Sequence, residues 1–468
     1  MASARTIPRI MIAAVGSGSG KTTVAVGLMA ALRARGLRVA PFKCGPDYLD
    51  PSYHARAALR PSHNLDGWMM GREAVLATFA GAAEDADIAI IEGMMGLFDG
   101  ATPESDEGSS AEIAKWLETP VLLVVDSSGM ARTIGAIASG FARFDPALRL
   151  AGLICNRIGG RGHFEILRSA SPGVPVLGAF PRYDEAAFPE RHLGLFSADE
   201  QNVPSARIDA WGALAAEWLD LDAILAVARG APGIPASAPA AASAAGNNLC
   251  RIGIADDEAF HFYYRYNLAL LEAHGAKLVR FSPTHDRVLP EVDGLYFGGG
   301  YPEVAAPALS ANHAMIAAVQ RFAASERPIY AECGGLMYLL ERIRVPGGET
   351  FTMAGLLPGE AVMHDRLQTL GYVEVATRGE SILGPAGLLF RGHQFRYSTL
   401  EPPPPTNLER VYQVTPRWGG AGFAEGYKTG NVLASYVHAH WASNPAIARN
   451  LVAACTAPRP ASRRNPAG

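Results

Sequence analysis

The stretch Pro328-Ile329-Tyr330-Ala331-Glu332-Cys333-Gly334-Gly335-Leu336 joins a short apolar run to a helical pattern through one cysteine and two glycines. The apolar run predicts a buried strand, and the glycines permit a tight turn into a helix. On such a nucleophile elbow, Cys333 would be presented to a substrate. The free N–H groups at the start of the helix would lower the thiol pKa and could hold an oxyanion. The stretch therefore predicts an α/β fold with a cysteine nucleophile at a strand end.

A second strand-to-helix turn lies near the N-terminus. There, Gly16-Ser17-Gly18-Ser19-Gly20-Lys21-Thr22-Thr23 follows the apolar run Ile10–Val15. In a phosphate loop, backbone N–H groups cradle phosphates, the lysine reaches the β- and γ-phosphates, and the hydroxyl meets Mg²⁺. The usual first glycine is Val15 here, and a generic Gly/Ser turn is the alternative. We predict an ATP and Mg²⁺ site with nucleotide contacts from Gly18, Gly20, Lys21, Thr22 and Thr23.

The whole chain has the composition of a globular protein. Its 468 residues exceed one core of ordinary size, so two or three domains are expected. The net charge of −4 gives no basis for binding nucleic acid. No apolar run approaches the ~20 residues that span a bilayer, and no signal-peptide pattern is present. The five cysteines are scattered without metal-ligand spacing, so reduced thiols and a cytoplasmic protein are expected.

One composition shift divides the chain. Residues 230–248 contain no charged or aromatic side chain, which predicts a flexible linker. Strand and helix patterns alternate on both sides of it and indicate parallel sheets covered by helices. The prediction is two α/β domains, 1–229 and 249–456, with a disordered tail at 457–468. The predicted strands are Ile10–Val15, Arg38–Phe42, Ile88–Glu92, Val121–Asp126, Gly152–Asn156, Arg251–Ala255, Lys277–Ser282, Gly294–Gly298, Pro328–Glu332 and Leu433–His438.

Polar residues follow several of these strands, at the edge where open α/β sheets bind ligands. Glu92 ends one strand, and its carboxylate can hold Mg²⁺ directly or through water, with helix capping as the alternative. Asn156 ends another strand, where its amide could bind an adenine edge or cap a turn. Both residues are therefore candidates for the nucleotide site.

The loop Lys43–His54 concentrates a lysine, two aspartates and two tyrosines between Pro and Gly residues, more than solubility requires. Asp47 is a second candidate for Mg²⁺. Tyr48 and Leu49 could stack on a large flat ligand. We predict that this loop lies at the same edge of the sheet as the nucleotide.

Three segments together show a specific resemblance: residues 16–23, 42–51 (FKCGPDYLDP) and 91–100 (IEGMMGLFDG). They resemble the cobyrinic acid a,c-diamide synthase family, which includes the hydrogenobyrinic acid a,c-diamide synthases of aerobic cobalamin biosynthesis. The resemblance covers nearly the whole chain outside the linker and tail. It implies an N-terminal domain similar to dethiobiotin synthetase and a C-terminal domain similar to class I glutamine amidotransferases. The substrate contacts that it implies are Asp47, Tyr48, Leu49, Asp50 and Asp99.

The C-terminal half carries more of this resemblance. The segment 293–303 is a strand ending in three glycines, a turn that can aim N–H groups at a developing oxyanion. In the family, the histidine of the segment Ser-Tyr-x-His activates the thiol, so His438 is the predicted base for Cys333. Many glutaminases have a glutamate two residues later, where this chain has His440, so a cysteine–histidine pair without a third member is expected. The role of His393, in a similar segment, is left open.

The resemblance implies a reaction at two sites. Cys333 would release ammonia from glutamine, while Mg-ATP would convert the a- and c-side-chain carboxylates of a corrin macrocycle into acyl phosphates that ammonia attacks. Hydrogenobyrinic acid is preferred to cobyrinic acid because the chain is rich in Ala, Gly and Arg, like family members from aerobic, high-GC bacteria. The oligomeric state stays open, with a homodimer as one option.

Two other interpretations remain. The same chemistry could act on another tetrapyrrole, such as a nickel sirohydrochlorin, or the chain could be a cobyric acid synthase. A phosphate-loop ATPase switch that binds a protein partner belongs to a different class. Its loop usually carries an extra lysine where this chain has Gly16, and it would leave the C-terminal half without a purpose.

Overall fold

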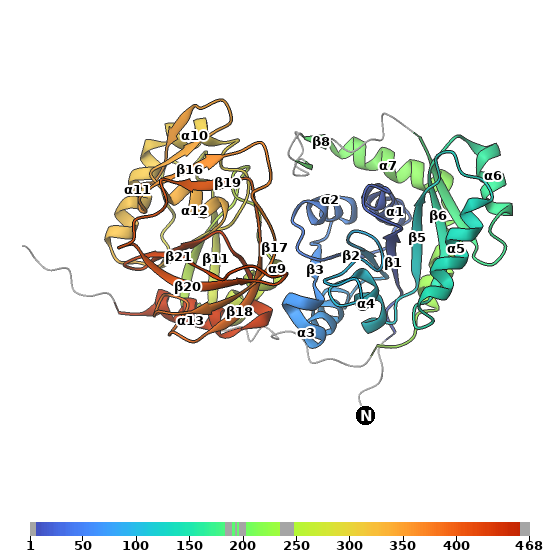
Figure 1. Ribbon diagram of the computed structural model, residues 1–468, viewed down its shortest axis with the longest axis horizontal. Helices are drawn as coiled ribbons and strands as arrows, with labels where there is room; N and C mark the ends of the chain where they lie inside the picture. The colour runs from blue at the N-terminus through green and yellow to red at the C-terminus, as the bar shows by residue number, and fades with distance from the viewer. Residues whose placement is uncertain (1–5, 183–189, 192–193, 196–202, 235–247, 459–468) are drawn as a thin grey trace, which may run out of the picture. The chain divides into compact units, whose positions relative to one another are not determined.

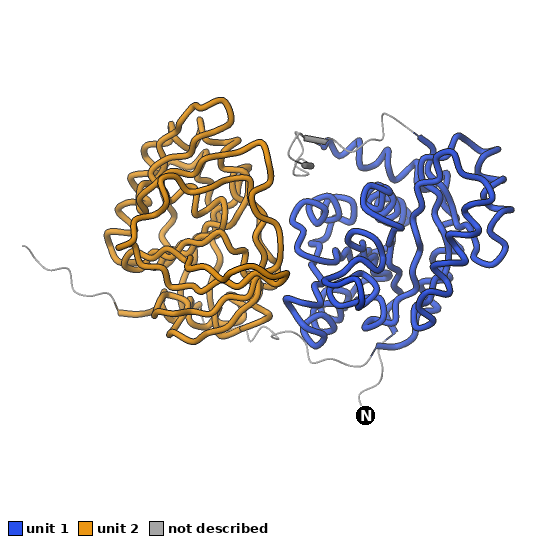
Figure 2. Tube along the Cα trace, in the orientation of Figure 1, with its two compact units in different colours: residues 1–240 blue, residues 241–468 orange. Residues whose placement is uncertain are grey.

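The computed structural model describes residues 6–182, 190–191, 194–195, 203–234 and 248–458. The chain divides into two compact units, residues 1–240 and 241–468 (Figure 2). The first residues of the predicted linker belong to the first unit, because Ala231 and Ile234 are buried and the Pro232 carbonyl accepts a hydrogen bond from Arg9. Residues 235–247 of that linker and 459–468 of the predicted tail lie outside the described residues.

The N-terminal unit is built on a seven-stranded sheet in the order β3-β2-β4-β1-β5-β6-β7, with all neighbours parallel (Figure 1). Parallel neighbours need a crossover, and the alternating helices supply it. The strands are β1 (Arg9–Ala14), β2 (Val39–Cys44), β3 (His63–Leu65), β4 (Ile88–Glu92), β5 (Val121–Asp126), β6 (Leu150–Ile158) and β7 (Val176–Pro181), with a separate pair, β8 (Glu190–Arg191) and β9 (Gly194–Leu195). The helices are α1 (Lys21–Ala34), α2 (Leu49–Ala58), α3 (Gly67–Ala82), α4 (Ser110–Trp116), α5 (Thr133–Phe144), α6 (Arg161–Ser169), α7 (Ser205–Trp218) and α8 (Leu221–Arg229).

Helices cover both faces of this sheet. The apolar sides of α1, α2, α7 and α8 form one core with β1, β4, β5 and their neighbours. Gly27 lets α1 approach α7, because a methyl group there would lie 3.1 Å from the carbonyl oxygen of Trp211. On the opposite face, the Phe79 ring of α3 lies 5.0 Å from the Phe42 ring of β2. The loops at the carboxyl ends of the strands are left to form a site.

The C-terminal unit contains a ten-stranded mixed sheet in the order β11-β10-β12-β13-β22-β21-β20-β17-β18-β23 and a four-stranded sheet in the order β15-β14-β16-β19. Its strands are β10 (Cys250–Ala255), β11 (Ala276–Phe281), β12 (Gly294–Phe297), β13 (Ile329–Glu332), β14 (Arg342–Arg344), β15 (Thr350–Thr352), β16 (Glu360–Met363), β17 (Thr369–Thr377), β18 (Leu389–Arg396), β19 (Ser398–Glu401), β20 (Glu409–Pro416), β21 (Phe423–Thr429), β22 (Val432–Ser435) and β23 (His438–His440). Its helices are α9 (Arg265–Ala273), α10 (Ala306–Ala311), α11 (His313–Ala324), α12 (Gly334–Leu339) and α13 (Ala446–Thr456), with a 3₁₀ turn η2 (Trp441–Ser443).

Only part of this larger sheet is parallel, namely β10 to β13 with β22. The remaining strands pair antiparallel, so the sheet is mixed. The predicted single strand Leu433–His438 is wrong. The chain stays beside β13 up to Ser435 and then pairs with β18 from His438. This change of partner carries the histidines onto a separate short strand.

Candidate active sites

The glycine-rich loop after β1 takes a conformation that needs glycine. Gly18 and Gly20 have φ angles of +75° and +91°, which side chains disfavour. A methyl group on Gly20 would also lie 2.0 Å from the amide nitrogen of Asn156. That nitrogen donates to the carbonyl of Ser19 at 2.9 Å. Asn156, inside β6, therefore holds the loop in place, a contact that neither proposed role for it included.

The two side chains expected to meet the nucleotide begin α1. Lys21 Nζ donates to the carbonyl oxygen of Met95 at 2.6 Å, and burial lowers the pKa of Lys21, with Lys43 adding to the effect. Thr22 Oγ1 donates to Glu92 Oε1 at 2.8 Å. The structure thus brings Thr22 and Glu92 together, as a shared Mg²⁺ site requires. Thr23, next along, is half-buried.

Glu92 is fully buried and has two partners that the sequence did not indicate. Its Oε1 accepts from Lys43 Nζ at 3.0 Å, and its Oε2 lies 2.6 Å from His54 Nε2. Burial acts to raise the pKa of Glu92, but Lys43 and His54 outweigh it and hold that pKa below its usual range. The register Lys43↔Glu92 between β2 and β4 produces this pairing. Lys43 and His54 lie in the loop that the sequence singled out, but the sequence indicated no contact between either residue and Glu92.

The remaining predicted substrate residues lie around this pair. Asp50 is ion-paired with Lys43 at 2.6 Å, and Asp47 Oδ2 lies 4.0 Å from the same ammonium. The other Asp47 oxygen accepts from the backbone N–H groups of Leu49 and Asp50 and so starts α2. Tyr48 and Leu49 are half-buried at this helix start. Asp99 accepts from the N–H of Gly96 and contributes charge near Lys21.

The charges at this edge fit a divalent cation. Four carboxylates (Asp47, Asp50, Glu92 and Asp99) surround two ammonium groups (Lys21 and Lys43), so two negative charges are in excess when all are ionised. Burial raises the pKa of Asp50, and the charges of Asp47 and Glu92 add to this effect. Within the described ranges no three His, Cys, Asp or Glu side chains are arranged to hold a metal on their own. Mg²⁺ bound to a nucleotide needs only one or two carboxylates, with water and phosphate completing its shell.

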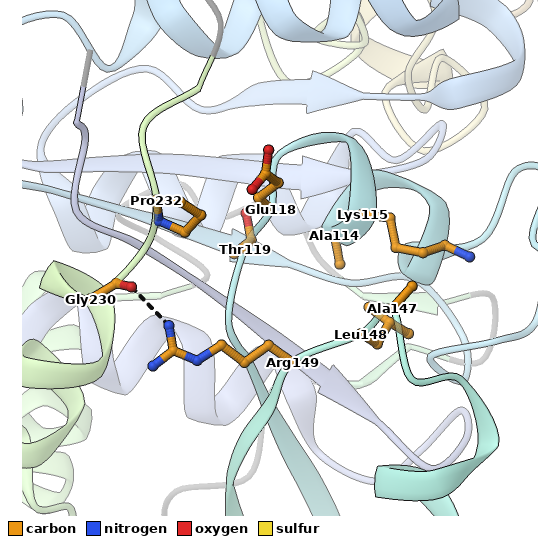
Figure 3. Close-up of a pocket in the computed structure, with 9 residues that line it drawn as sticks. All are labelled: Ala114, Lys115, Glu118, Thr119, Ala147, Leu148, Arg149, Gly230 and Pro232. Atoms are coloured by element: carbon orange, nitrogen blue, oxygen red, sulfur yellow. Dashed lines mark hydrogen bonds between the residues drawn. The ribbon is translucent and has the colours of Figure 1, made fainter. Parts of the chain in front are cut away.

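A pocket of about 420 Å³ opens elsewhere on this unit (Figure 3). Its lining includes Thr119 and Arg149, which precede β5 and β6, whereas the glycine loop follows β1. Because the strands are parallel, the pocket lies at the edge opposite the glycine loop. Arg149 is engaged with the carbonyl of Gly230, and Lys115 with Asp106 and Asp145. The pocket is therefore separate from the nucleotide site.

In the C-terminal unit, Cys333 occupies the strained turn predicted between β13 and α12. Its φ and ψ are 47° and −101°, a combination that side chains rarely adopt. A methyl group on Gly335 would lie 2.4 Å from the carbonyl oxygen of Phe297, which explains the need for glycine. Burial raises the pKa of Cys333 to about 12. The expected lowering of the thiol pKa is thus wrong for the free protein, because burial outweighs the short helix.

The three-glycine turn contacts both the elbow and the predicted base. A methyl group on Gly334 would lie 3.1 Å from the nitrogen of Gly300, and one on Gly299 would lie 2.4 Å from Cε1 of His438. The structure therefore places the turn against both the elbow and His438. The N–H groups of Gly300 and Gly334 are candidates to hold an oxyanion formed at the cysteine.

His438 is buried, and its ring stacks on that of His393 with centroids 4.9 Å apart and planes at 13°. The two residues are register partners between β18 and β23, and His393 Nδ1 is 3.0 Å from the hydroxyl of Tyr264. Burial lowers the pKa of His438 to about 3. His438 is therefore neutral at rest and a weak base in the free protein, and His393 supports its ring.

His440 does not contact His438 in the way that a triad acid would. Its Nδ1 accepts a hydrogen bond from the N–H of Ala442, and its ring packs 4.5 Å from that of Tyr264. The backbone between the two histidines is bound instead by Glu332, whose Oε1 accepts from the N–H of Ala439 at 3.1 Å. Sequence reasoning missed Glu332, although a carboxylate at the end of an apolar strand was a usable signal.

The fold and the two sites define a nucleotide-binding glutamine amidotransferase. Residues 10–195 match the CobQ/CobB/MinD/ParA nucleotide-binding domain, and residues 251–446 match the CobB/CobQ-like glutamine amidotransferase domain. Over 449 residues the chain is 53% identical to the cobyrinate a,c-diamide synthase of Leptospira interrogans serovar Lai, covering 96% of this chain and 98% of that one. It is 49% identical over 453 residues to that of Syntrophotalea carbinolica, with coverages of 96% and 98%.

The chain therefore belongs to the cobyrinate a,c-diamide synthase family. The similarity extends to a more distant relative in Dehalococcoides mccartyi, at 44% identity over 460 residues, or 95% of this chain and 97% of that one. Among the described residues, each helix is too short or too polar to cross a membrane.

Proposed function

We propose that this chain catalyses the glutamine- and ATP-dependent amidation of the a and c carboxylates of a cobyrinate-type macrocycle. The observation that carries the proposal is the presence, in one chain, of a charged phosphate-loop site and a buried cysteine elbow with a neutral histidine. Phosphate activation needs the first site and ammonia release needs the second. The names of the relatives favour cobalt-bearing cobyrinate over the cobalt-free acid that composition favoured.

In the C-terminal unit, Cys333 Sγ attacks the side-chain amide carbon of glutamine. The pKa of Cys333 is raised and that of His438 is lowered, so the pair is neutral at rest and the thiol proton moves to His438 as the C–S bond forms. The N–H groups of Gly300 and Gly334 stabilise the oxyanion. The C–N bond then breaks, the leaving ammonia takes the proton from His438, and water hydrolyses the thioester to glutamate and the free thiol.

In the N-terminal unit, Lys21 and the loop N–H groups bind the ATP phosphates, and Thr22 and Glu92, with Asp47, would hold Mg²⁺. The bound cation would offset charge on the transferring phosphoryl group. A macrocycle carboxylate attacks the γ-phosphorus of ATP, and the bond to the β-phosphate oxygen breaks to release ADP and leave an acyl phosphate. Ammonia then attacks the acyl carbon, phosphate leaves, and loss of a proton gives the amide. Asp47, Tyr48, Leu49, Asp50 and Asp99 would position the macrocycle.

The test supplies the protein with glutamine, Mg-ATP and either cobyrinic or hydrogenobyrinic acid, and counts amidations by mass spectrometry. Two amidations of the cobalt acid are expected. Amidation of hydrogenobyrinic acid alone would make the cobalt-free acid the substrate and would leave the proposed mechanism unchanged. ATP hydrolysis without any amidation of either acid would contradict the proposal.

A further inference from the structure

Among the described residues, the strand that carries His438 has only one strand beside it. In the larger sheet β23 is the last of the described strands and pairs with β18. Its other edge is bound by buried side chains instead. The Ala439 N–H donates to Glu332 at 3.1 Å, and Asn267 binds both the Ala439 carbonyl, at 2.8 Å, and the Trp441 N–H, at 2.9 Å. Two polar side chains thus do for this edge what a further strand would do.

Glu332 has features of a dedicated acceptor. It is 1% exposed, and besides the Ala439 N–H its carboxylate accepts from the hydroxyls of Tyr330, at 2.8 Å, and Tyr296, at 2.9 Å. No cation of the described residues contributes to its ionisation. A buried carboxylate without a cation is costly and persists only where several donors satisfy it. Those donors come from β12, β13 and β23, so Glu332 joins three strands.

The position of Glu332 links the two reacting residues. It precedes Cys333 in the chain, and its hydrogen bond reaches the residue that follows His438. A strand of three residues is weakly held in register by one neighbour, and a slip of one residue would exchange His438 for Ala439 on the reacting side. The charge of Glu332 disfavours the thiolate of Cys333, so electrostatic activation of the thiol does not explain its presence.

We propose that Glu332 is the positioning residue of the glutaminase site, acting through the backbone of β23. In a triad, an acid two residues after the histidine orients the histidine ring, and this chain has His440 at that position. We infer that Glu332 replaces that acid and holds the backbone instead of the ring. This inference rests on the proposed roles of Cys333 and His438. It predicts that acceptance of the Ala439 N–H, rather than negative charge, is what glutamine hydrolysis requires.

The experiment compares Glu332→Gln with Glu332→Leu in the full-length protein. The glutamine oxygen can still accept from Ala439, whereas leucine leaves that N–H unpaired. For Glu332→Leu we expect kcat of glutamine-dependent synthesis to fall about 100-fold, as for a misplaced catalytic group, with KM for glutamine nearly unchanged. Glu332→Gln should retain activity to within about 10-fold. Ammonia-dependent synthesis should stay at the level of the unaltered protein in both.

Two further variants serve as controls. Tyr330→Phe removes a donor from the carboxylate without touching Ala439, and it should leave kcat nearly unchanged. Asn267→Leu releases the same strand edge at a second point, so it should lower kcat in the manner of Glu332→Leu. If Glu332→Leu fails to fold, Asn267→Leu still tests whether glutamine hydrolysis depends on this strand edge.

The outcomes separate the inference from the function on which it rests. Equal losses in Glu332→Gln and Glu332→Leu would show that charge matters and would overturn the inference. Full activity of Glu332→Leu, or an equal loss of the ammonia-dependent reaction, would overturn it too. If Cys333→Ala kept glutamine-dependent synthesis, the proposed glutaminase site itself would be wrong.

Discussion

The phosphate-loop site buries ion pairs, whereas the cysteine site buries a thiol and histidines in their uncharged forms. In the first, Lys43 lies among Asp50, Glu92 and Asp47, and Glu92 is held ionised at full burial. In the second, burial keeps Cys333, His438 and His440 neutral. Burial in a low-dielectric interior is therefore compensated by ion pairing in one unit, whereas in the other it keeps the titratable groups uncharged.

The difference follows from what each site has to do. A site for phosphates and a divalent cation needs fixed charges, and it can bury them because they are mutually paired before the ligand arrives. A site that transfers a proton from sulfur to imidazole needs both groups neutral at the start. Because the charged groups of the phosphate-loop site are paired with one another, its activity should depend on each of them. Because the titratable groups of the cysteine site are buried, the stability of its unit should depend on pH.

Cys333→Ala should separate the two sites most completely. Loss of the nucleophile is expected to reduce glutamine-dependent synthesis by at least about 10³-fold while ammonia-dependent synthesis continues, because the phosphate-loop site is untouched. Product formation with glutamine and with ammonium salt measures both. Cys455→Ala, a buried cysteine outside the site, is the control. Loss of both activities in Cys333→Ala would mean that the two sites are not separable.

Glu92→Gln should affect the opposite site. It weakens the proposed Mg²⁺ ligand, leaves His54 without its buried anion and removes one of the anions around Lys43, so synthesis from either nitrogen source should fall by about 100-fold. ATP turnover measured over a range of Mg²⁺ concentrations provides the readout, and the exposed Glu73→Gln is the control. Near-normal turnover would remove Glu92 from the nucleotide site.

The C-terminal unit should lose stability in mild acid. Burial lowers the pKa values of His393, His438 and His440, so below about pH 6.5 the unfolded chain binds three protons that the folded unit does not. Burial raises the pKa of Glu332 to about 7, which opposes the effect with one proton, and it raises the pKa of Glu425 in the same direction. The three histidines outnumber these two carboxyl groups, so stability should fall as the pH falls from roughly 6.5 to 5.

Hydrogen exchange of the amides in β13 and β22 can follow this loss in the full chain. His438→Gln removes one titrating group and should reduce the slope. Stability that increases from pH 6.5 to pH 5 would contradict the idea that these histidines are buried in their neutral form.

Asn156→Ala should have the smallest effect. It leaves the buried carbonyl of Ser19 without its donor, so the loop loses about 1–2 kcal/mol of restraint and KM for ATP should rise about 10-fold. Glutamine hydrolysis should be unchanged. A larger effect on turnover than on KM would contradict a role confined to loop restraint. Asn156→Asp, which lacks the donor and adds a negative charge beside the carbonyl of Ser19, should weaken ATP binding more than the alanine variant.

Local sequence patterns were sufficient for the main parts of both sites. The glycine loop, Lys21 and Thr22 depend on contacts within a few residues, and so does the elbow at Cys333. Contacts across the sheet were not accessible in this way. Lys43 meets Glu92 because β2 and β4 are neighbours, and Asn156 reaches Ser19 from β6. Glu332 and Asn267 bind the backbone of Ala439 beside His438, and His393 stacks on the ring of His438, only after β23 leaves β13 for β18.

The sequence by itself determined the two α/β units, the strand-to-helix turns that carry the loop and the cysteine, and the family to which the chain belongs. These follow from short-range periodicity and from glycines at turns that other residues cannot adopt. Only the tertiary structure decided the charge state of each site and the partners that hold it. Those depend on burial and on strand register, which join residues far apart in the chain, such as Asn267 and Ala439, 172 positions apart.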